Sequence, residues 1–250
     1  MGTLLERYIS VIAFIIVVML WEGGCRLFNV QEFILPSPFA IVGSLSSLPA
    51  ARWMEHILAT LGVALSGFAV AIAVALPLAS AIVSSRLLSR LLMPWLVVIQ
   101  STPIVAIAPI IVVCLGAGVM PRVLITMLIA FFPIVISTAT GLNSVPPEMI
   151  ELSRSLRASR AREYWQIRMP YAIPYIFSAL KVAITLSIIG AVVAEFVAAE
   201  QGLGYLILFS TSSFKMPLAF ASLLILVCST LTLYGLVVWI HKRLFAWSIS

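Results

Sequence analysis

Residues 57–83 read ILATLGVALSGFAVAIAVALPLASAIV, a run without one ionisable side chain. About 20 such residues are enough for an α-helix to cross the hydrocarbon core of a bilayer. A helix is also one of the few structures that satisfies its own backbone hydrogen bonds in lipid. This stretch therefore predicts a membrane-spanning helix, and it decides the class of the protein.

Five further apolar runs predict six spans in total. They cover Tyr8–Trp21, Leu91–Leu115, Val123–Leu142, Pro174–Val197 and Pro217–Ile240. The first run resembles the core of a signal peptide, but no small-residue cleavage site follows it, so we interpret it as a retained helix. Residues 31–51 are too short and too broken by proline to span, and they predict an amphipathic segment at the membrane surface.

The composition agrees with this count. Of the 250 residues, 62% are hydrophobic and 10% are charged, whereas a soluble chain is about half apolar and about a quarter charged. Disordered chains, disulfide scaffolds and most soluble enzymes are thereby excluded. The three cysteines are far apart and fit no metal or redox motif. We expect an all-α polytopic membrane protein with residues 1–250 forming a single domain.

The basic residues predict the orientation. With six spans, ten of the fifteen lysines and arginines fall on one side of the membrane, four fall on the other, and Lys181 lies inside a span. Positive charge marks the cytoplasmic side. Both termini and the loop between the fourth and fifth spans should therefore be cytoplasmic.

That loop, residues 143–170, is the polar segment of the chain. Pro146 and Pro147 suit a helix start, with Asn143 or Ser144 available as the cap. Ser159 suits the start of a second helix, so two short helices joined near residues 157–159 would form a compact protrusion. The alternative from charge alone is an ordinary charged loop that its arginines keep inside.

The spacing within this segment resembles the EAA loop of bacterial ABC-importer permeases, E-A-A-x3-G followed by I-x-L-P. Residues 151–159 read ELSRSLRAS and residues 164–170 read YWQIRMP, and the register fits without a gap. Two departures stand out: Leu152-Ser153 replaces the double alanine, and Arg157 stands where the family usually has glycine. A side chain at a left-handed backbone position is costly, so Arg157 leaves open whether the turn keeps that conformation.

Four other stretches resemble permeases of the taurine, nitrate and sulfonate type: LPSP at 35–38, TPIVAIAP at 102–109, FFP at 131–133 and GLGY at 202–205. The variants AIAP at 106–109 and AEF at 194–196 are similar to the branch for pyrimidine-type thiamine precursors or riboflavin. The resemblance implies a type I importer permease for such a heterocycle. Taurine, an alkanesulfonate or nitrate is the alternative cargo.

The resemblance implies that residues 151–167 form a coupling helix seated in a separate ATPase subunit. Glu151 would pair with a basic group or cap the protrusion, and Tyr164 would be the aromatic anchor. The remaining implied coupling residues are Arg157 at the turn, Ala158 and Ser159 for close approach, and Pro170 at the entry to the fifth span.

The family also implies the partners. They are ATP-binding cassette subunits, a periplasmic or lipid-anchored solute-binding protein, membrane lipid and a second permease chain, which we expect to be a second copy of this one. No nucleic-acid partner and no cofactor are expected. ATP hydrolysis is assigned to a partner, because none of the three lysines follows a glycine as a phosphate-binding G-x4-G-K-[ST] loop requires. We expect the protein in the bacterial inner membrane and expect it not to be an enzyme.

Polar residues inside spans are the candidates for the solute pathway. They are Gln100, Ser101, Thr102, Thr138, Ser187 and Glu195, and Thr140 and Thr185 are further candidates. Residues 100–102 lie about ten residues into the third run, near mid-membrane at about 1.5 Å per residue. For each hydroxyl the competing interpretation is a hydrogen bond between helices or back to its own helix.

Other ionisable groups have structural alternatives. Lys181 is expected to extend towards the cytoplasmic interface rather than contact solute. Glu195 and Glu200 would line a gate or dock the binding protein, or else be solvated loop carboxylates. His56 and His241 flank spans and suit interface positions.

Two other classes compete with an importer permease. A secondary transporter often has paired broken helices in two related halves and carboxylates within its spans, and we see neither pattern here. A membrane enzyme would need clustered ionisable groups or metal ligands, which two distant histidines do not supply.

Overall fold

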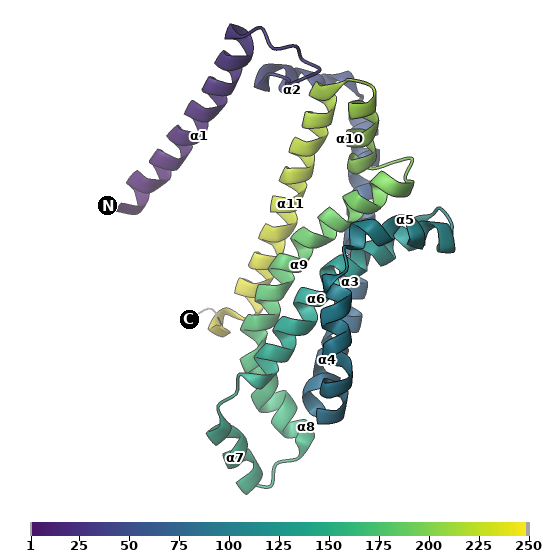
Figure 1. Ribbon diagram of the computed structural model, residues 1–250. Helices are drawn as coiled ribbons and strands as arrows, with labels where there is room; N and C mark the ends of the chain where they lie inside the picture. The colour runs from purple at the N-terminus through teal and green to yellow at the C-terminus, as the bar shows by residue number, and fades with distance from the viewer. Residues whose placement is uncertain (1, 249–250) are drawn as a thin grey trace.

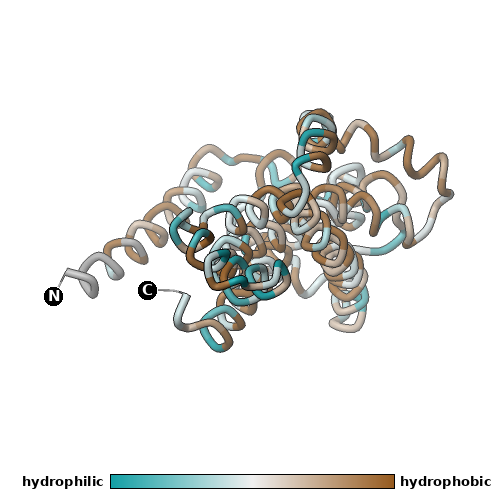
Figure 2. The backbone as a smooth tube through the Cα atoms, turned by 90° about the horizontal axis from the view of Figure 1, so that it is seen from below, coloured by the Kyte–Doolittle hydropathy of each residue, from teal (hydrophilic) through white to brown (hydrophobic). Residues whose placement is uncertain are grey.

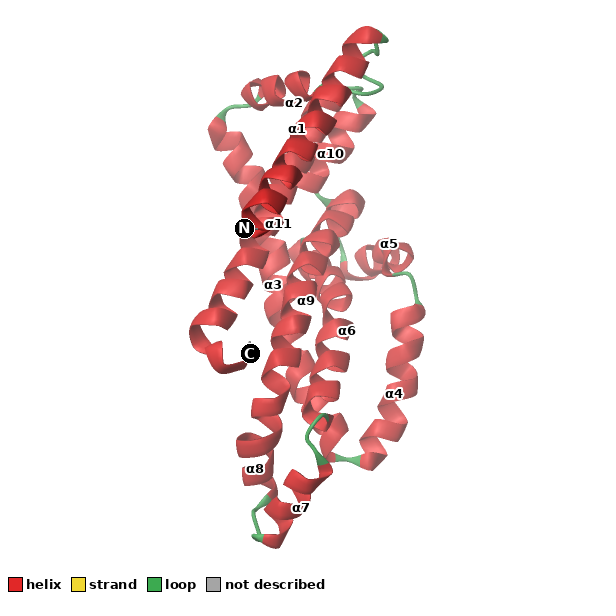
Figure 3. Cartoon of the chain, turned by 90° about the vertical axis from the view of Figure 1, so that its left-hand side faces the viewer, coloured by secondary structure: helices red, strands yellow, loops and turns green. Residues whose placement is uncertain are grey.

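The computed structural model describes residues 2–248, and the side chains of these except residues 2–7 and 10. Every regular element in this part of the chain is helical (Figure 3). The long helices are α1 (Gly2–Leu27), α3 (Ala50–Ser84), α6 (Val119–Asn143), α9 (Met169–Ala198) and α11 (Met216–Leu244). The shorter ones are α2 (Pro38–Ser44), η1 (Leu45–Ser47), α4 (Arg86–Ser101), α5 (Ile104–Leu115), α7 (Pro147–Ser155), α8 (Arg160–Glu163), a π-helical η2 (Tyr164–Arg168), α10 (Leu203–Ser212) and η3 (Ala246–Ser248).

Helices α3, α6 and α9 form the centre, and α11 runs alongside α9 (Figure 1). Small residues let them approach closely, as in many membrane helix pairs. Gly67 of α3 and Gly190 of α9 both lie against Thr126 of α6, and an added Cβ at either position would overlap it. Large apolar side chains cover much of the outer surface, and hydrophobic residues run along most of the tube in Figure 2. An apolar exterior of this kind suits a lipid environment.

The expected spans are largely present. Among the described residues, four helical stretches are long and apolar enough to cross a membrane: α3, α6, α11 and the continuous stretch 160–198 that ends in α9. If the bent pair of α4 and α5 is counted as one span, the described residues contain five candidate spans. The first predicted run lies in α1, which is not among these five, so a sixth span stays a prediction.

The third predicted span is wrong as a single straight helix. The chain breaks after Ser101, and α5 leaves at 96° to α4. Thr102 is extended at φ −82° and ψ 126°, and Pro103 follows it. Proline disfavours a helical residue before it and lacks the N–H that a continuous helix needs. Residues 100–102 therefore lie at a bend and not in the middle of a straight span.

The segment after α1 packs more tightly than the expected surface segment. Ile41 of α2 is buried in one cluster with Trp53, Leu203, Leu206 and Ala221. The indole N–H of Trp53 donates to the carbonyl of Leu45 at 2.9 Å. Residues 38–47 thus cover the ends of α10 and α11, and α10 is a helix that the apolar pattern did not predict.

Candidate functional site

The polar segment forms a protrusion at one end of the molecule. Helix α7 leads away from the end of α6 and α8 leads back into α9, which places both beyond the central helices (Figure 1). The prediction of two short helices joined at residues 157–159 is confirmed, and the Ser159 side chain caps α8 by accepting from the Arg162 N–H at 3.3 Å. The expected cap of α7 is wrong: Pro146, and not Asn143 or Ser144, precedes its first turn, with Pro147 as its first residue.

Arg157 keeps the left-handed turn. Its φ is 51°, the Ala158 N–H donates to the Ser153 carbonyl at 3.0 Å, and the Arg157 N–H donates to the Arg154 carbonyl at 2.9 Å. This pair of bonds is the Schellman motif that ends many helices, usually with glycine in the left-handed position. The turn therefore keeps the left-handed backbone conformation even though arginine stands at the position where the family usually has glycine.

Glu163 holds the protrusion together. Its carboxylate lies 2.8 Å from Nη2 of Arg168, and Nη1 of Arg168 donates to the Leu142 carbonyl at the end of α6. Arg154 of α7 lies 3.9 Å from the same carboxylate. Glu151 is exposed and makes no ion pair within the described residues, so its pairing with a basic group stays a prediction.

Tyr164 points into the protein and not outward. Its hydroxyl is 2.5 Å from Oγ of Ser80 on α3, and its ring packs on Leu142, Ala172 and Ile176. The role of Tyr164 as the aromatic anchor to a partner stays a prediction. The exposed aromatic is the next residue, Trp165, at 65% exposure. Sequence reasoning missed it, although an exposed tryptophan in an arginine-rich loop is itself a sign of a contact surface.

The second arm of the protrusion continues directly into α9. Residues 160–198 form one helical stretch through α8, the π-helical turn η2 and α9, with Pro170 in the first turn of α9. Ala158 is half-buried and Ser159 is exposed at the tip. A continuous helix of this kind can carry a displacement of the tip into the central bundle as a rigid body.

The polar groups of most pathway candidates form hydrogen bonds within the chain. Ser101 donates to the Val97 carbonyl at 2.8 Å, Thr102 to Val98 at 3.0 Å and Ser187 to Ile184 at 2.8 Å. Thr138, Ser187 and Glu195 are at most 1% exposed. These three are therefore corrected: neighbouring helices enclose them, so they line no open surface of the chain in this conformation.

Gln100 differs from these residues. It is exposed one residue before the end of α4 and lines a groove of about 470 Å³ with Ser137 and Thr140 of α6 and Tyr175 and Ser178 of α9. The hydroxyl of Ser137 donates to the Tyr175 carbonyl at 3.0 Å. Of the six residues first proposed, Gln100 is the one that the structure places in a groove.

Glu195 belongs to a buried polar cluster at the start of α10. Three successive backbone N–H groups donate to three side chains: Gly202 to Nδ1 of His56 at 3.0 Å, Leu203 to Oγ1 of Thr60 at 2.8 Å, and Gly204 to Oε2 of Glu195 at 2.7 Å. These donors have no partner within their own helix, and a carboxylate there also meets the positive end of the helix dipole.

The cluster corrects one expectation, because Glu195 is 1% exposed and is not a solvated loop carboxylate. His56 is buried in the same cluster, at 7% exposed. His241 is likewise buried and stacks on Phe177 at 4.3 Å between ring centroids. Lys181 of α9 is half-buried.

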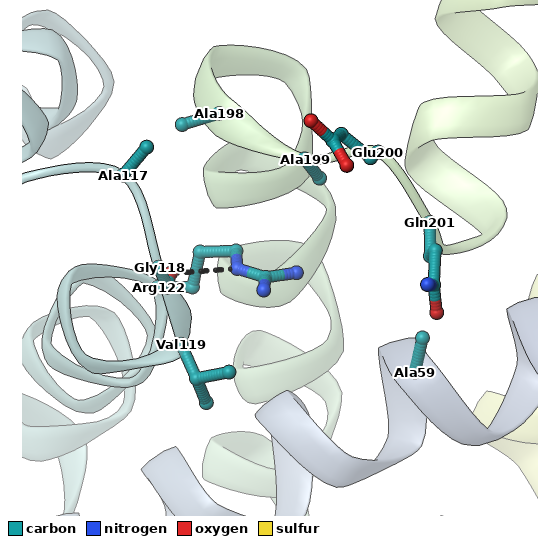
Figure 4. Close-up of a pocket in the computed structure, with 9 residues that line it drawn as sticks. All are labelled: Ala59, Ala117, Gly118, Val119, Arg122, Ala198, Ala199, Glu200 and Gln201. Atoms are coloured by element: carbon teal, nitrogen blue, oxygen red, sulfur yellow. Dashed lines mark hydrogen bonds between the residues drawn. The ribbon is translucent and has the colours of Figure 1, made fainter.

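A second hollow of about 680 Å³ lies where the α5–α6 loop approaches the end of α9 (Figure 4). Arg122 lines it and donates from Nε to the Gly118 carbonyl at 2.9 Å, while Glu200 and Gln201 lie on the loop before α10. Glu200 is exposed and so remains a candidate for contact with a partner. Within the described residues no group of three His, Cys, Asp or Glu side chains could hold a metal ion.

The chain resembles known transport proteins over most of its length. Residues 67–246 match the model of the family described as "binding-protein-dependent transport system inner membrane component". The riboflavin transport system permease protein RibX of Chloroflexus aurantiacus is 38% identical over 240 residues, which is 96% of this chain and 90% of RibX. The formylaminopyrimidine transport permease protein ThiX of Halalkalibacterium halodurans is 31% identical over 213 residues, 85% of each chain.

A solved structure has the same fold. One chain of the MetNI methionine ABC transporter, in inward-facing conformations, superposes with a TM-score of 0.65 at 18% identity, covering 77% of this chain and 94% of that one.

Proposed function

The chain belongs to the binding-protein-dependent transport system inner membrane component family as a permease subunit of an ABC importer, and we propose that its cargo is a riboflavin-like or pyrimidine-type heterocycle. The main observation that supports this choice of cargo is the 38% identity to a riboflavin permease protein over 96% of the chain. A formylaminopyrimidine permease protein at 31% identity supports the same chemistry. Both solutes are nitrogen heterocycles.

The protrusion is the surface that we assign to separate ATPase subunits. Arg157 is exposed at its tip, and Glu151 on α7 and Trp165 near its base are exposed as well. Tyr164 and Glu163 fix the base to α3 and to Arg168. Closure of an ATPase dimer around the tip would move α9 as a rigid body, because the second arm and α9 are one helical stretch. These internal contacts would let the protrusion move as one rigid unit with α9.

The remaining partners follow from the same proposal. A solute-binding protein delivers the cargo on the side opposite the protrusion, and a second copy of this chain completes the pathway. The protrusion and both termini are assigned to the cytoplasmic side of the inner membrane by the distribution of lysine and arginine.

Reconstituted transport tests the function. The chain is assembled in proteoliposomes with the ATPase subunits and binding protein encoded beside it, and uptake of labelled riboflavin and formylaminopyrimidine is measured with and without ATP inside. We expect uptake of one of these solutes only with ATP and the complete assembly. Uptake without any ATPase subunit, or uptake of taurine or nitrate in place of both heterocycles, would contradict the proposal.

A further inference from the structure

The groove beside Gln100 lies where the broken helix meets two central helices. The chain bends by 96° directly after α4, and α6 and α9 supply the facing side chains. Its volume of about 470 Å³ falls in the range of about 300–1,000 Å³ that small-molecule sites occupy. The groove is open on one side, so a solute inside it would contact this chain and leave one face to another wall.

The polar groups of the groove fall into two sets. Ser137 and Thr140 donate their hydroxyl hydrogens to the carbonyls of Tyr175 and Ile136. The Gln100 amide and the Tyr175 and Ser178 hydroxyls make no hydrogen bond within the described residues. An amide among membrane-spanning helices is costly without a partner. These groups are thus available to a polar ligand.

The groove has no formal charge. Its lining contains no Lys, Arg, His, Asp or Glu among the described residues. Lys181 of α9 is not among its lining residues. An anion moved from water into a site of low dielectric needs a counter-charge, so the groove does not suit a sulfonate or nitrate. The Tyr175 ring offers a flat face on which a planar ligand can stack.

We infer that this groove is the solute contact of the chain and that it takes an uncharged planar heterocycle, whose edge bonds to Gln100 and whose face lies on Tyr175. The inference rests on the proposed function, because it assumes that the chain imports a solute. It adds the position of the contact and a reason, independent of the relatives, why the solute is neutral.

Uptake by the reconstituted assembly tests the contact. Gln100→Ala and Tyr175→Leu should each raise the KM for labelled riboflavin or formylaminopyrimidine about tenfold, the cost of an unpaired polar group or a lost stacking partner. Ser84→Ala on α3 is the control, because its hydroxyl donates to the Ser80 carbonyl of its own helix and the residue does not line the groove. It should leave KM unchanged.

Thiol labelling gives a readout that does not depend on transport. In the assembled complex with Cys25, Cys114 and Cys228 replaced by alanine, Ser178→Cys should react with a maleimide and be protected by the transported heterocycle. Ser101→Cys should react without protection. Lack of protection at position 178 would overturn the groove assignment even if the Gln100 variant failed to fold.

The outcomes separate the two proposals. If the wild-type assembly imports a heterocycle and Gln100→Ala and Tyr175→Leu do so with unchanged KM, the groove assignment is overturned and the proposed function stands. If the wild-type assembly imports a sulfonate or nitrate instead, both are overturned.

Discussion

The carboxylate of Glu195 on α9 accepts a hydrogen bond of 2.7 Å from the backbone N–H of Gly204 at the start of α10. The contact is possible because residues 202 and 204 are glycines: a Cβ at either position would overlap the Glu195 side chain. With His56 and Thr60 of α3, it fixes the start of α10 between two central helices. This arrangement and the protrusion lead to four predictions.

Gly202→Ala should lower the free energy of unfolding by about 2 kcal/mol or more. Gly202 has a φ of 128°, and an added Cβ would meet the Glu195 carboxylate, so the substitution is strained in backbone and in space. The measurement is the midpoint of thermal unfolding in detergent. Gly235→Ala is the control, because nothing lies within 4 Å of its Cβ position, and an equal midpoint for the two variants would contradict the prediction.

Arg157→Gly should stabilise the protrusion by about 1 kcal/mol, because glycine adopts the left-handed backbone of this turn without the steric cost of a side chain. Arg162→Gly should do the opposite by about the same amount, since Arg162 lies in a right-handed helix. Hydrogen exchange of the amides of residues 153–163 measures both effects. The prediction fails if the two glycine substitutions change exchange in the same direction.

Tyr164→Phe and Ser80→Ala should each cost about 1 kcal/mol through loss of the same hydrogen bond. The double variant should then cost little more than either single variant, which a double-mutant cycle on thermal unfolding measures. Ser84→Ala is the control, because that hydroxyl bonds to the Ser80 carbonyl in its own helix and not to Tyr164. Strict additivity of Tyr164→Phe and Ser80→Ala would mean that the two side chains do not interact.

Trp165→Ala should reduce ATP-dependent uptake about tenfold while leaving the unfolding midpoint unchanged, because an exposed tryptophan at an interface often contributes 2 kcal/mol or more to binding. Trp165 is 65% exposed on the protrusion. Trp239→Ala on α11 is the matched control, with 61% exposure away from the protrusion. Co-purification of the ATPase subunits should weaken for Trp165→Ala alone, and retention of full uptake and binding by this variant would remove the tryptophan from the contact.

The pattern of apolar runs predicted most of the helices correctly but not how one of them is bent. Runs such as residues 57–83 are long and apolar. Length and hydropathy are local properties of the sequence, so they predict a spanning helix however the helices pack. The break at Thr102-Pro103 was misjudged because many membrane helices tolerate proline: Pro77 and Pro133 stay inside α3 and α6. Whether a proline bends a helix depends on the neighbours that can satisfy the freed carbonyls.

The candidate site was predicted in part for the same reason. Spacing along the chain located the protrusion and its joint, since capping and turn formation act over a few residues. It did not single out Trp165, because two adjacent aromatics are equivalent in sequence until α3 places Ser80 beside one of them. Gln100 was found because an amide among apolar residues is conspicuous without any structure.

The sequence by itself determined that this is an all-helical membrane protein with one arginine-rich protrusion, because both features depend on composition and on short-range spacing. Only the tertiary structure decided which polar groups form hydrogen bonds inside the chain. Glu195 and His56 bind the start of α10 from helices α9 and α3, and Glu195 meets Gly204 across a turn of chain whose path local spacing does not specify. Burial and hydrogen-bond pairing arise only when the helices pack together. They distinguish the enclosed carboxylate of Glu195 from the unpaired amide of Gln100.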